Sequence, residues 1–218
     1  MSARAHIVCL SAVMIAGFAS MNTSAQAEGW QPLFNGKDLD GWNHVGPGQF
    51  VIEDGVLRTD GGMGLLWYTR EKFADATIRV VYSAPQPKGA GNSGVFIRIP
   101  DKPTEPWAPV NTGYEVQIDE NDSDFHRTGV LYSFTKAQGT PPAREWSTME
   151  ITLDGDRTLV VVNGVTVTDF REGDAVPEKQ KPSEPDRGRR ANKGYIGLQN
   201  HSDKDVVLFR EISVRKNR

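Results

Sequence analysis

Short runs of β-branched and aromatic residues, separated by turn residues, recur along the chain and constrain its fold more than any other feature. The clearest local signal is Asn163-Gly164, which divides residues 158–170 into two runs rich in β-branched side chains. Asn and Gly accept the positive φ angles of a tight type I′ turn, so this stretch predicts a β-hairpin. Asp54-Gly55 divides residues 49–59 in the same way and predicts a second pair of short strands.

The rest of the chain follows the same pattern. No window has a sustained 3.6-residue apolar period, although residues 68–73 could form a helical turn. Ten or more short strands without alternating helices predict an all-β fold, built as an antiparallel sandwich or barrel. The further strands are expected at residues 76–84, 93–99, 114–119, 128–134, 147–155, 194–200 and 206–214.

One long segment fits no strand. Residues 176–193 are charged and rich in proline, and they show no apolar period. This composition predicts a long surface loop, and the alternative is a flap that covers a binding site. No linker indicates a second folded domain.

The first 27 residues have the pattern of a secretory signal peptide. Arg4 supplies a positive charge, residues 7–19 are apolar but too short to span a bilayer comfortably, and Ala25-Gln26-Ala27 fits an A-x-A cleavage site. We therefore expect a signal peptide at residues 1–27 and a single mature domain at residues 28–218. A membrane anchor is the alternative, and it is disfavoured because no second apolar stretch follows.

Cysteine and charge narrow the class of protein. Cys9 is the only cysteine, and it lies at the front of the apolar run, where a lipoprotein would not carry it. The mature chain therefore has no disulfide, which fits a periplasmic or secreted bacterial protein stabilised by packing. The formal net charge of −3 becomes one unit more negative without Arg4. Such a mildly acidic chain gives no reason to expect nucleic acid or an anionic membrane as a partner.

Residues 114–119 (YEVQID) form the strand of greatest chemical interest. Successive side chains of a strand point to opposite faces, so Tyr114, Val116 and Ile118 share one face. Glu115, Gln117 and Asp119 share the other. Two interpretations are open. This polar face is exposed to solvent, as is common on a half-exposed sheet, or it forms the floor of a binding site.

Neighbouring segments favour the second reading. The strand at residues 93–99 places Arg98 with Phe96, and an arginine among apolar positions can grip a carboxylate or a sugar hydroxyl. The glycines at 89, 91 and 94 would let the backbone approach a ligand closely, or they serve only a turn. Trp107, in a Pro-rich segment, is the tryptophan best suited to stack on a sugar ring.

The sequence predicts no cofactor. His44, His126 and His201 lack metal-ligand spacing such as H-x-x-x-H, so a zinc site has weak support. The acidic run at residues 119–124 could coordinate calcium, but it lacks the Gly and the terminal Glu of an EF-hand loop. A divalent metal therefore stays an open alternative.

Several motifs occur together in an order typical of one family. From residue 32 to residue 214 these motifs are PLFNGKDLDGW, GGMGLLWY, GNSGVFIR, GYEVQIDE, TGVLY, EWSTMEI, VNGVTVTDF and GYIGLQNH followed by VLFREISV. On these motifs the chain resembles the 3-keto-disaccharide hydrolase domain family over nearly all of residues 29–216. Two positions depart mildly from the usual pattern, Glu211 in place of Asn and the extra acid Glu120.

The resemblance implies a concanavalin A-like jelly-roll sandwich, in which a concave sheet holds the sugar. Laminarinase-like enzymes of this architecture carry catalytic acids as E-x-D-x-x-E on one concave strand. Here Glu115 fits the first acid, whereas Gln117 replaces an acid by an amide and the last spacing differs. The departure argues against the ordinary two-carboxylate mechanism of glycosidases.

The family name implies a different chemistry, on a small-molecule sugar partner. A ketone at C3 acidifies the C2 proton, so a base can remove it and the enolate can expel the C1 oxygen. Glu115 or His201 could be the base, and the ketone could be polarised by Arg98, Gln117 or Tyr132. We expect Glu115, Arg98 and His201 to converge in one pocket beside Gln117, with Asp119, Tyr132 and Trp107 as further sugar contacts. The alternative is a non-catalytic carbohydrate-binding module on the same fold.

Overall fold

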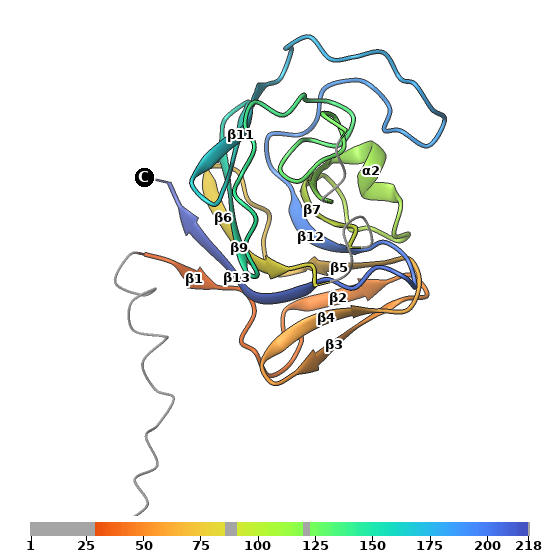
Figure 1. Cartoon of the computed structure of the whole chain (residues 1–218), viewed down its shortest axis with the longest axis vertical. Helices are drawn as coiled ribbons and strands as arrows, with labels where there is room; N and C mark the ends of the chain where they lie inside the picture. Colours follow the sequence, from red (N-terminus) through yellow and green to blue (C-terminus); the bar gives the residue numbers. More distant parts are fainter. Residues whose placement is uncertain (1–28, 86–90, 120–122, 218) are drawn as a thin grey trace, which may run out of the picture.

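The computed structural model describes residues 29–85, 91–119 and 123–217 (Figure 1). The expected signal peptide with its cleavage site, Gly89 and residues 120–122 of the acidic run lie outside these ranges. Across the described ranges, no helix is long and apolar enough to cross a bilayer.

Two antiparallel sheets make up nearly all of the regular structure, which confirms the all-β sandwich prediction. One sheet contains β1 (Gln31–Pro32), β3 (Gln49–Glu53), β4 (Val56–Asp60), β6 (Ala76–Ser83), β9 (Ser147–Asp154), β10 (Arg157–Val162), β11 (Val165–Arg171) and β13 (Leu208–Lys216). Its order is β11-β10-β9-β6-β13-β4-β3, and β1 pairs with β13. The other contains β2 (Trp42–Val45), β5 (Gly64–Tyr68), β7 (Ser93–Ile99), β8 (Tyr114–Ile118) and β12 (Tyr195–Asn200) in the order β2-β5-β12-β7-β8.

Both predicted tight turns are present. Asn163 and Gly164 have φ angles of 49° and 83° between β10 and β11, and Asp54 and Gly55 have 50° and 81° between β3 and β4. Positive φ at both central residues is what a type I′ turn requires, and its twist matches that of the paired strands.

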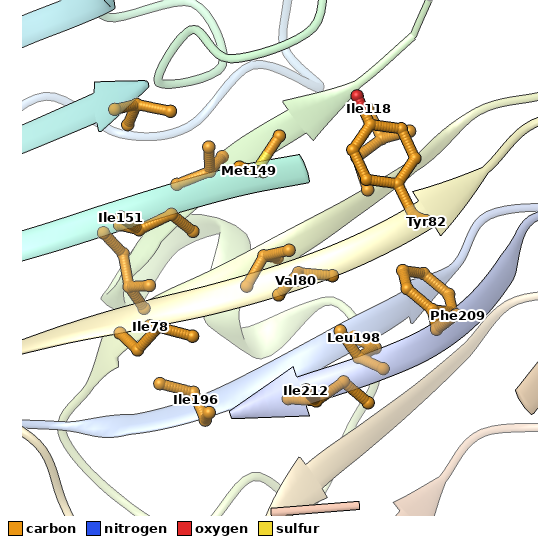
Figure 2. Close-up of a cluster of buried hydrophobic side chains, with 14 of the residues drawn as sticks. Ile78, Val80, Tyr82, Ile118, Met149, Ile151, Ile196, Leu198, Phe209 and Ile212 are labelled. Atoms are coloured by element: carbon orange, nitrogen blue, oxygen red, sulfur yellow. The ribbon is translucent and has the colours of Figure 1, made fainter. Parts of the chain in front are cut away.

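The main hydrophobic core lies between the two sheets. Figure 2 shows side chains from both sheets meeting there, with Ile78, Val80, Ile151 and Ile212 from the larger sheet and Ile118, Ile196 and Leu198 from the smaller one. Val116 and Ile118 of β8 are buried in this core, as their alternation predicts. Their neighbours Glu115 and Gln117 therefore lie on the opposite, outer face of the five-stranded sheet.

A second apolar cluster covers part of that outer face. Figure 1 shows the short helix α2 (Ala108–Thr112) on the side of β7 and β12 that faces away from β6 and β9. Val110 of α2 packs there with Leu65, Trp67, Phe96 and Ile99. The outer face is thus partly covered and can carry a site that water does not fully reach.

Two segments differ from the prediction. Residues 68–73 form no helical turn, and Phe73 instead makes a β-bridge with Gly194. Residues 128–134 follow β8 but form only one isolated bridge, between Leu131 and Val116. Ser133 then turns the chain away with a φ angle of 60°, which ends the pairing.

Candidate functional site

A cavity of about 250 Å³ opens on the outer face of the five-stranded sheet, beside the apolar cluster under α2. It is lined by Asn92, Trp107, Val110, Glu115, Gln117, Tyr132, Ser183, Gln199 and His201. Five of the residues singled out in the sequence are among them: Glu115, Gln117, Tyr132, Trp107 and His201. Segments far apart in the chain therefore meet at one place.

Glu115 forms part of the floor of this cavity and is only 6% exposed. It lies on β8 opposite Phe96 of β7, and Gly94 of β7 lies opposite Gln117. A Cβ atom on Gly94 would come within 2.5 Å of Glu115 Oε1 and 2.6 Å of its Cγ. The close approach that glycine permits at this position is therefore to the Glu115 side chain.

The carboxyl of Glu115 has an unusual proton affinity. Burial raises its pKa from an ordinary 4.5 to about 8, and a hydrogen bond from the Gln199 side chain opposes this rise only in part. Removing a carboxylate from water disfavours its charged form. At neutral pH most of Glu115 is therefore protonated, and the group can donate a proton.

His201 lies at another wall of the cavity, where its ring is hydrogen-bonded to the carboxylate of Asp205. Its Nδ1 lies 2.7 Å from Asp205 Oδ2, and the Asp205 carboxylate also accepts from Ser202 Oγ at 2.6 Å and from the Asn92 backbone N–H at 3.0 Å. Burial by itself would raise the pKa of Asp205, but these hydrogen bonds together hold it below its usual value. With Nδ1 directed at Asp205, Nε2 is the ring nitrogen left to accept a proton.

The remaining walls come from three loops. Tyr132 follows β8, where its backbone N–H donates to Glu115 O at 2.9 Å. Burial raises the pKa of its phenol, and the charges of Glu115 and Glu184 raise it further, so the hydroxyl stays protonated. Trp107 stands at the rim directly before α2 and is 52% exposed, as an aromatic platform requires.

Ser183 comes from the long charged loop at residues 176–193. That loop is tied to the site region, because Arg190 Nε donates to Gly113 O at 2.8 Å and Asn111 Oδ1 accepts from the Asp186 N–H at 3.0 Å. Both partners lie at the C-terminal end of α2. The loop is therefore on the surface and also contributes one wall of the cavity.

Asp119 lies behind the cavity floor. It is buried, and its Oδ2 accepts from Asn92 Nδ2 at 3.4 Å, while Asn92 Oδ1 accepts from Gln117 Nε2 at 3.1 Å. Asp119 does not line the cavity, but hydrogen bonds through Asn92 connect it to Gln117, which does.

Arg98 is not in the cavity, contrary to the expected convergence with Glu115 and His201. The pairing of β7 with β12 shifts between Phe96 and Ile99, and Arg98 has a φ angle of 57°. Such a β-bulge breaks the alternation of side chains along a strand. The Arg98 side chain consequently points into the sandwich.

Inside the sandwich Arg98 is fully buried and joins the two sheets. Its guanidinium donates to the backbone oxygens of Gly155, Arg157 and Ala191 at 3.0–3.3 Å and to Thr158 Oγ1 at 3.3 Å. Burial lowers its pKa, although nearby acids, Glu172 foremost, act in the opposite direction. Arg98 is therefore a structural residue in this fold.

Sequence reasoning missed four polar residues of the site region, which are Asn92, Ser183, Gln199 and Asp205. Gln199 and His201 follow Tyr195 and Gly197 at steps of two, so the alternation in β12 could have identified Gln199. The spacing of His201 and Asp205 in one loop was also readable as a hydrogen-bonded pair. Asn92 and Ser183 gave no comparable signal, because only the fold brings their segments to the cavity.

A metal site finds limited support. Within the ranges that the structure describes, no group of three or more His, Cys, Asp or Glu side chains could hold a metal ion. The acidic run at residues 119–124 lies partly outside those ranges, so calcium binding there stays an open alternative.

Comparison with known proteins gives consistent similarities. A model of the family described as 3-keto-alpha-glucoside-1,2-lyase-like domain matches residues 29–215. The chain is 24% identical to the 3-keto-disaccharide hydrolase of Bacteroides thetaiotaomicron, over 90% of this chain and 81% of that protein.

Solved structures show the same sandwich fold. A "putative glycosyl hydrolase" from Parabacteroides distasonis matches with a TM-score of 0.69 at 22% identity, over 89% of this chain and 97% of that chain. The carbohydrate-binding module CBM66 from Bacillus subtilis matches with a TM-score of 0.54 at 16% identity, over 81% and 96% of the two chains.

Proposed function

Because the chain belongs to the 3-keto-alpha-glucoside-1,2-lyase-like domain family, we propose that it cleaves the glycosidic bond of 3-keto-glycosides in the cavity on the five-stranded sheet. One observation carries this proposal: the same cavity of about 250 Å³ brings together a protonated, buried Glu115 and an Asp205-held His201. Pairs of titratable groups whose surroundings separate their proton affinities are typical of acid–base sites. The cavity volume suits one sugar ring, since pockets for drug-sized ligands are larger, roughly 300–1,000 Å³.

The reaction is an elimination followed by hydration. A base takes the C2 proton, which the neighbouring C3 ketone acidifies, and the electron pair becomes the C3 enolate. The C1–O bond then breaks as the C1=C2 double bond forms, and an acid protonates the departing oxygen. Water adds its oxygen to C1 of the resulting enone and a proton returns to C2, so the net change is hydrolysis.

His201 is the base in this proposal. Its Nδ1 is held by Asp205, so its Nε2 can accept a proton, and Asp205 then stabilises the imidazolium that forms. Asp205 is itself fixed by Ser202 and by the Asn92 backbone. A base positioned in this way typically contributes about 10²–10⁴-fold to a proton transfer.

Glu115 is the acid that protonates the departing oxygen. With a pKa of about 8 it carries the needed proton at neutral pH, which makes it a poor base there. The sequence left Glu115 and His201 open as the base, and the pKa of Glu115 is the reason to choose His201. The opposite assignment would require activity to rise as Glu115 ionises.

A donor must also stabilise the enolate oxygen at C3. Arg98 was a candidate from the sequence, but its guanidinium is committed to backbone oxygens inside the sandwich. Tyr132 lines the cavity, and its raised pKa keeps the hydroxyl protonated and able to donate. We therefore assign the C3 oxygen to Tyr132 in this proposal.

The test uses purified protein with 3-keto-trehalose, 3-keto-sucrose and the two unoxidised sugars. Release of monosaccharide from the keto-sugars alone is expected, because only the C3 ketone acidifies C2. Equal cleavage of the unoxidised sugars would rule out the elimination chemistry.

A second function, non-catalytic carbohydrate binding, is favoured by the aromatic and amide side chains that line the cavity. Trp107 is exposed there, and Asn92, Gln117 and Gln199 offer amides of the kind that bind sugar hydroxyls. The fold similarity to CBM66, a carbohydrate-binding module, is consistent with that use. Saturable binding of sugars without any cleavage of keto-sugars would favour this alternative.

We also propose that residues 1–27 are removed on export and that the mature domain begins at Glu28, in the periplasm or the medium. The motivation is the A-x-A pattern that ends at Ala27. N-terminal sequencing of exported protein should begin at Glu28, and an intact Met1 on exported protein would contradict the proposal.

A further inference from the structure

Three polar side chains form a hydrogen-bonded row under the cavity. Gln117 Nε2 donates to Asn92 Oδ1 at 3.1 Å, and Asn92 Nδ2 donates to Asp119 Oδ2 at 3.4 Å. We call Gln117, Asn92 and Asp119 the amide chain. Gln117 is 3% exposed and lines the cavity at one end, and Asp119 is buried at the other.

Asp119 sets the direction of the whole row. The Asp119 carboxyl accepts from Asn92 Nδ2, and an amide has a donor end and an acceptor end. Asn92 must therefore turn its NH₂ group to Asp119 and its oxygen to Gln117. Gln117 in turn must direct its NH₂ group to Asn92, which leaves its carbonyl oxygen for the cavity. Gln117 Oε1 is buried and has no hydrogen-bond partner among the described residues.

Gln199 presents a second acceptor on the neighbouring part of the floor. Its side chain lies beside the carboxyl of Glu115, whose pKa it lowers as a hydrogen-bond donor. Its Oε1 is buried without a partner in the described part of the chain, and the side chain lines the same cavity. Two buried amide oxygens that have no partner among the described residues thus belong to side chains of the cavity that holds Glu115.

We propose that Gln117 Oε1 and Gln199 Oε1 are a pair of specificity-determining acceptors that bind two hydroxyl groups of the substrate sugar. This inference rests on the proposed function and defines its substrate class: 3-keto-glycosides that keep free hydroxyls on the ring that enters the cavity. A buried carbonyl without a partner is costly, and a substrate hydroxyl satisfies it. An analogue without that hydroxyl leaves the acceptor buried and unpaired, so the site rejects it.

The same chemistry orients the substrate. A ketone oxygen only accepts hydrogen bonds, so it cannot bind to either amide oxygen. The C3 ketone is therefore directed away from Gln117 and Gln199 and towards a donor such as Tyr132. The amide pair and Tyr132 together restrict how the ring can be placed.

The test compares 3-keto-glycosides in which one ring hydroxyl at a time is replaced by hydrogen or by fluorine. Fluorine keeps much of the polarity of a hydroxyl but donates no hydrogen bond. We expect two positions at which both replacements lower kcat/KM by roughly 10- to 100-fold, the scale for an unpaired buried acceptor. Turnover of every analogue within about twofold of the parent, well below that scale, would overturn the inference.

Variants of the amide chain separate this role from a merely structural one. In Asp119→Asn the end of the row can donate as well as accept, so Gln117 is free to turn its NH₂ group to the cavity. Discrimination at one hydroxyl position should therefore fall, while discrimination at the position read by Gln199 remains. A structural defect alone would lower kcat/KM for all substrates equally and leave both ratios unchanged, which would overturn the inference.

Matched variants complete the design. Asp124→Asn changes the same residue type five positions along the chain, where the carboxylate pairs with Lys136 on the surface, and it should alter neither ratio. Gln117→Met removes the acceptor at similar size and should abolish discrimination at the same position as Asp119→Asn. It serves as the deciding variant if Asp119→Asn does not fold, and retained discrimination in it would overturn the inference.

Failure of the proposed function is recognisable separately. If the wild-type protein cleaves no 3-keto-glycoside, the same series is measured by calorimetry for binding. Weaker binding of the analogues at two positions would still support the acceptor pair. Equal binding of all analogues, or no binding of any, would overturn it.

Discussion

The Glu115 side chain lies over Gly94, in the space that a side chain at position 94 would need. They lie on the adjacent strands β7 and β8, and a Cβ atom on Gly94 would lie 2.5 Å from Glu115 Oε1 and 2.9 Å from its Cδ. The missing side chain at position 94 therefore lets the Glu115 carboxyl lie flat on the sheet, where burial gives it a pKa of about 8. The acid of the proposed mechanism thus depends on a glycine on the neighbouring strand.

Gly94→Ala should displace the Glu115 carboxyl, since the contact is with a side chain that can move. We expect kcat on 3-keto-glycosides to fall by at least about tenfold, as misplacement of a reacting group by 1 Å can cost about 10². Gly62→Ala is the matched control, because a Cβ atom there meets nothing within 4 Å. Equal activities of the two variants would show that the placement of Glu115 does not matter.

Glu115→Gln should lower turnover by at least about 10²-fold, the usual scale for loss of a general acid or base. Its effect on stability should depend on pH. The folded state holds the Glu115 proton up to a pKa of about 8, while the unfolded chain releases it near 4.5. The raised pKa therefore costs stability as pH rises between these values, by at most about 1.4 kcal/mol per pH unit.

Gln carries no such proton, so the variant should gain stability relative to the wild type as pH rises from 4.5 to about 8, and the difference should level off above that pKa. Urea unfolding of both proteins across this range measures it. A difference that does not change with pH would mean that Glu115 titrates normally.

The rate should have a basic limb near pH 8. If Glu115 is the acid, kcat/KM falls as its carboxyl ionises, with an apparent pKa close to the value of about 8. Stopped assays on a 3-keto-glycoside from about two pH units below this value to about two above it would locate the limb. A rate that instead rises through the same range would make Glu115 the base.

Asp205→Asn should impair the base without removing it. The amide that replaces the carboxylate could still contact His201 Nδ1, but it cannot stabilise an imidazolium as a carboxylate does, and it can hold the ring in the wrong tautomer. We expect kcat to fall by at least about 10²-fold. Ser202→Ala, which removes one hydrogen bond to Asp205 and keeps its charge, should cost much less. Comparable losses in both variants would point to a structural role for the loop.

Arg98→Met should act on stability and not on chemistry. It removes the donors to the backbone oxygens of Gly155, Arg157 and Ala191 inside the sandwich. We expect a loss of at least about 2 kcal/mol in the free energy of unfolding, since several buried acceptors lose their donor. The folded fraction should keep its kcat. Arg171→Met is the control, since an exposed ion pair such as the one between Arg171 and Asp156 contributes about 1 kcal/mol at most.

Local sequence patterns predicted the parts of the fold that depend on residues close together in the chain, namely the alternation along a strand and the φ angles of a turn. Alternation placed Val116 and Ile118 in the core and Glu115 and Gln117 on the outer face, because one face of β8 had to be apolar. The Asn163-Gly164 turn was predictable because few residues accept its φ angles.

Two other features depend on long-range contacts and carried no local signal. The bulge that turns Arg98 inward is stabilised by carbonyls some sixty and ninety residues later in the chain, so alternation alone placed Arg98 on the wrong face. Asn92 and Ser183 reach the cavity only once β7, β8 and the loop at residues 176–193 are assembled.

Loss of deuterium from C2 tests the central claim most directly. A 3-keto-glycoside deuterated at C2 would be incubated with the wild-type protein and with Glu115→Gln, and the released 3-keto-sugar analysed by mass spectrometry against a sample without protein. The proposed elimination predicts that the wild-type product loses its C2 deuterium to water at the rate of cleavage, with both slowed together in the variant. A cleaved product that keeps its C2 deuterium would contradict the mechanism.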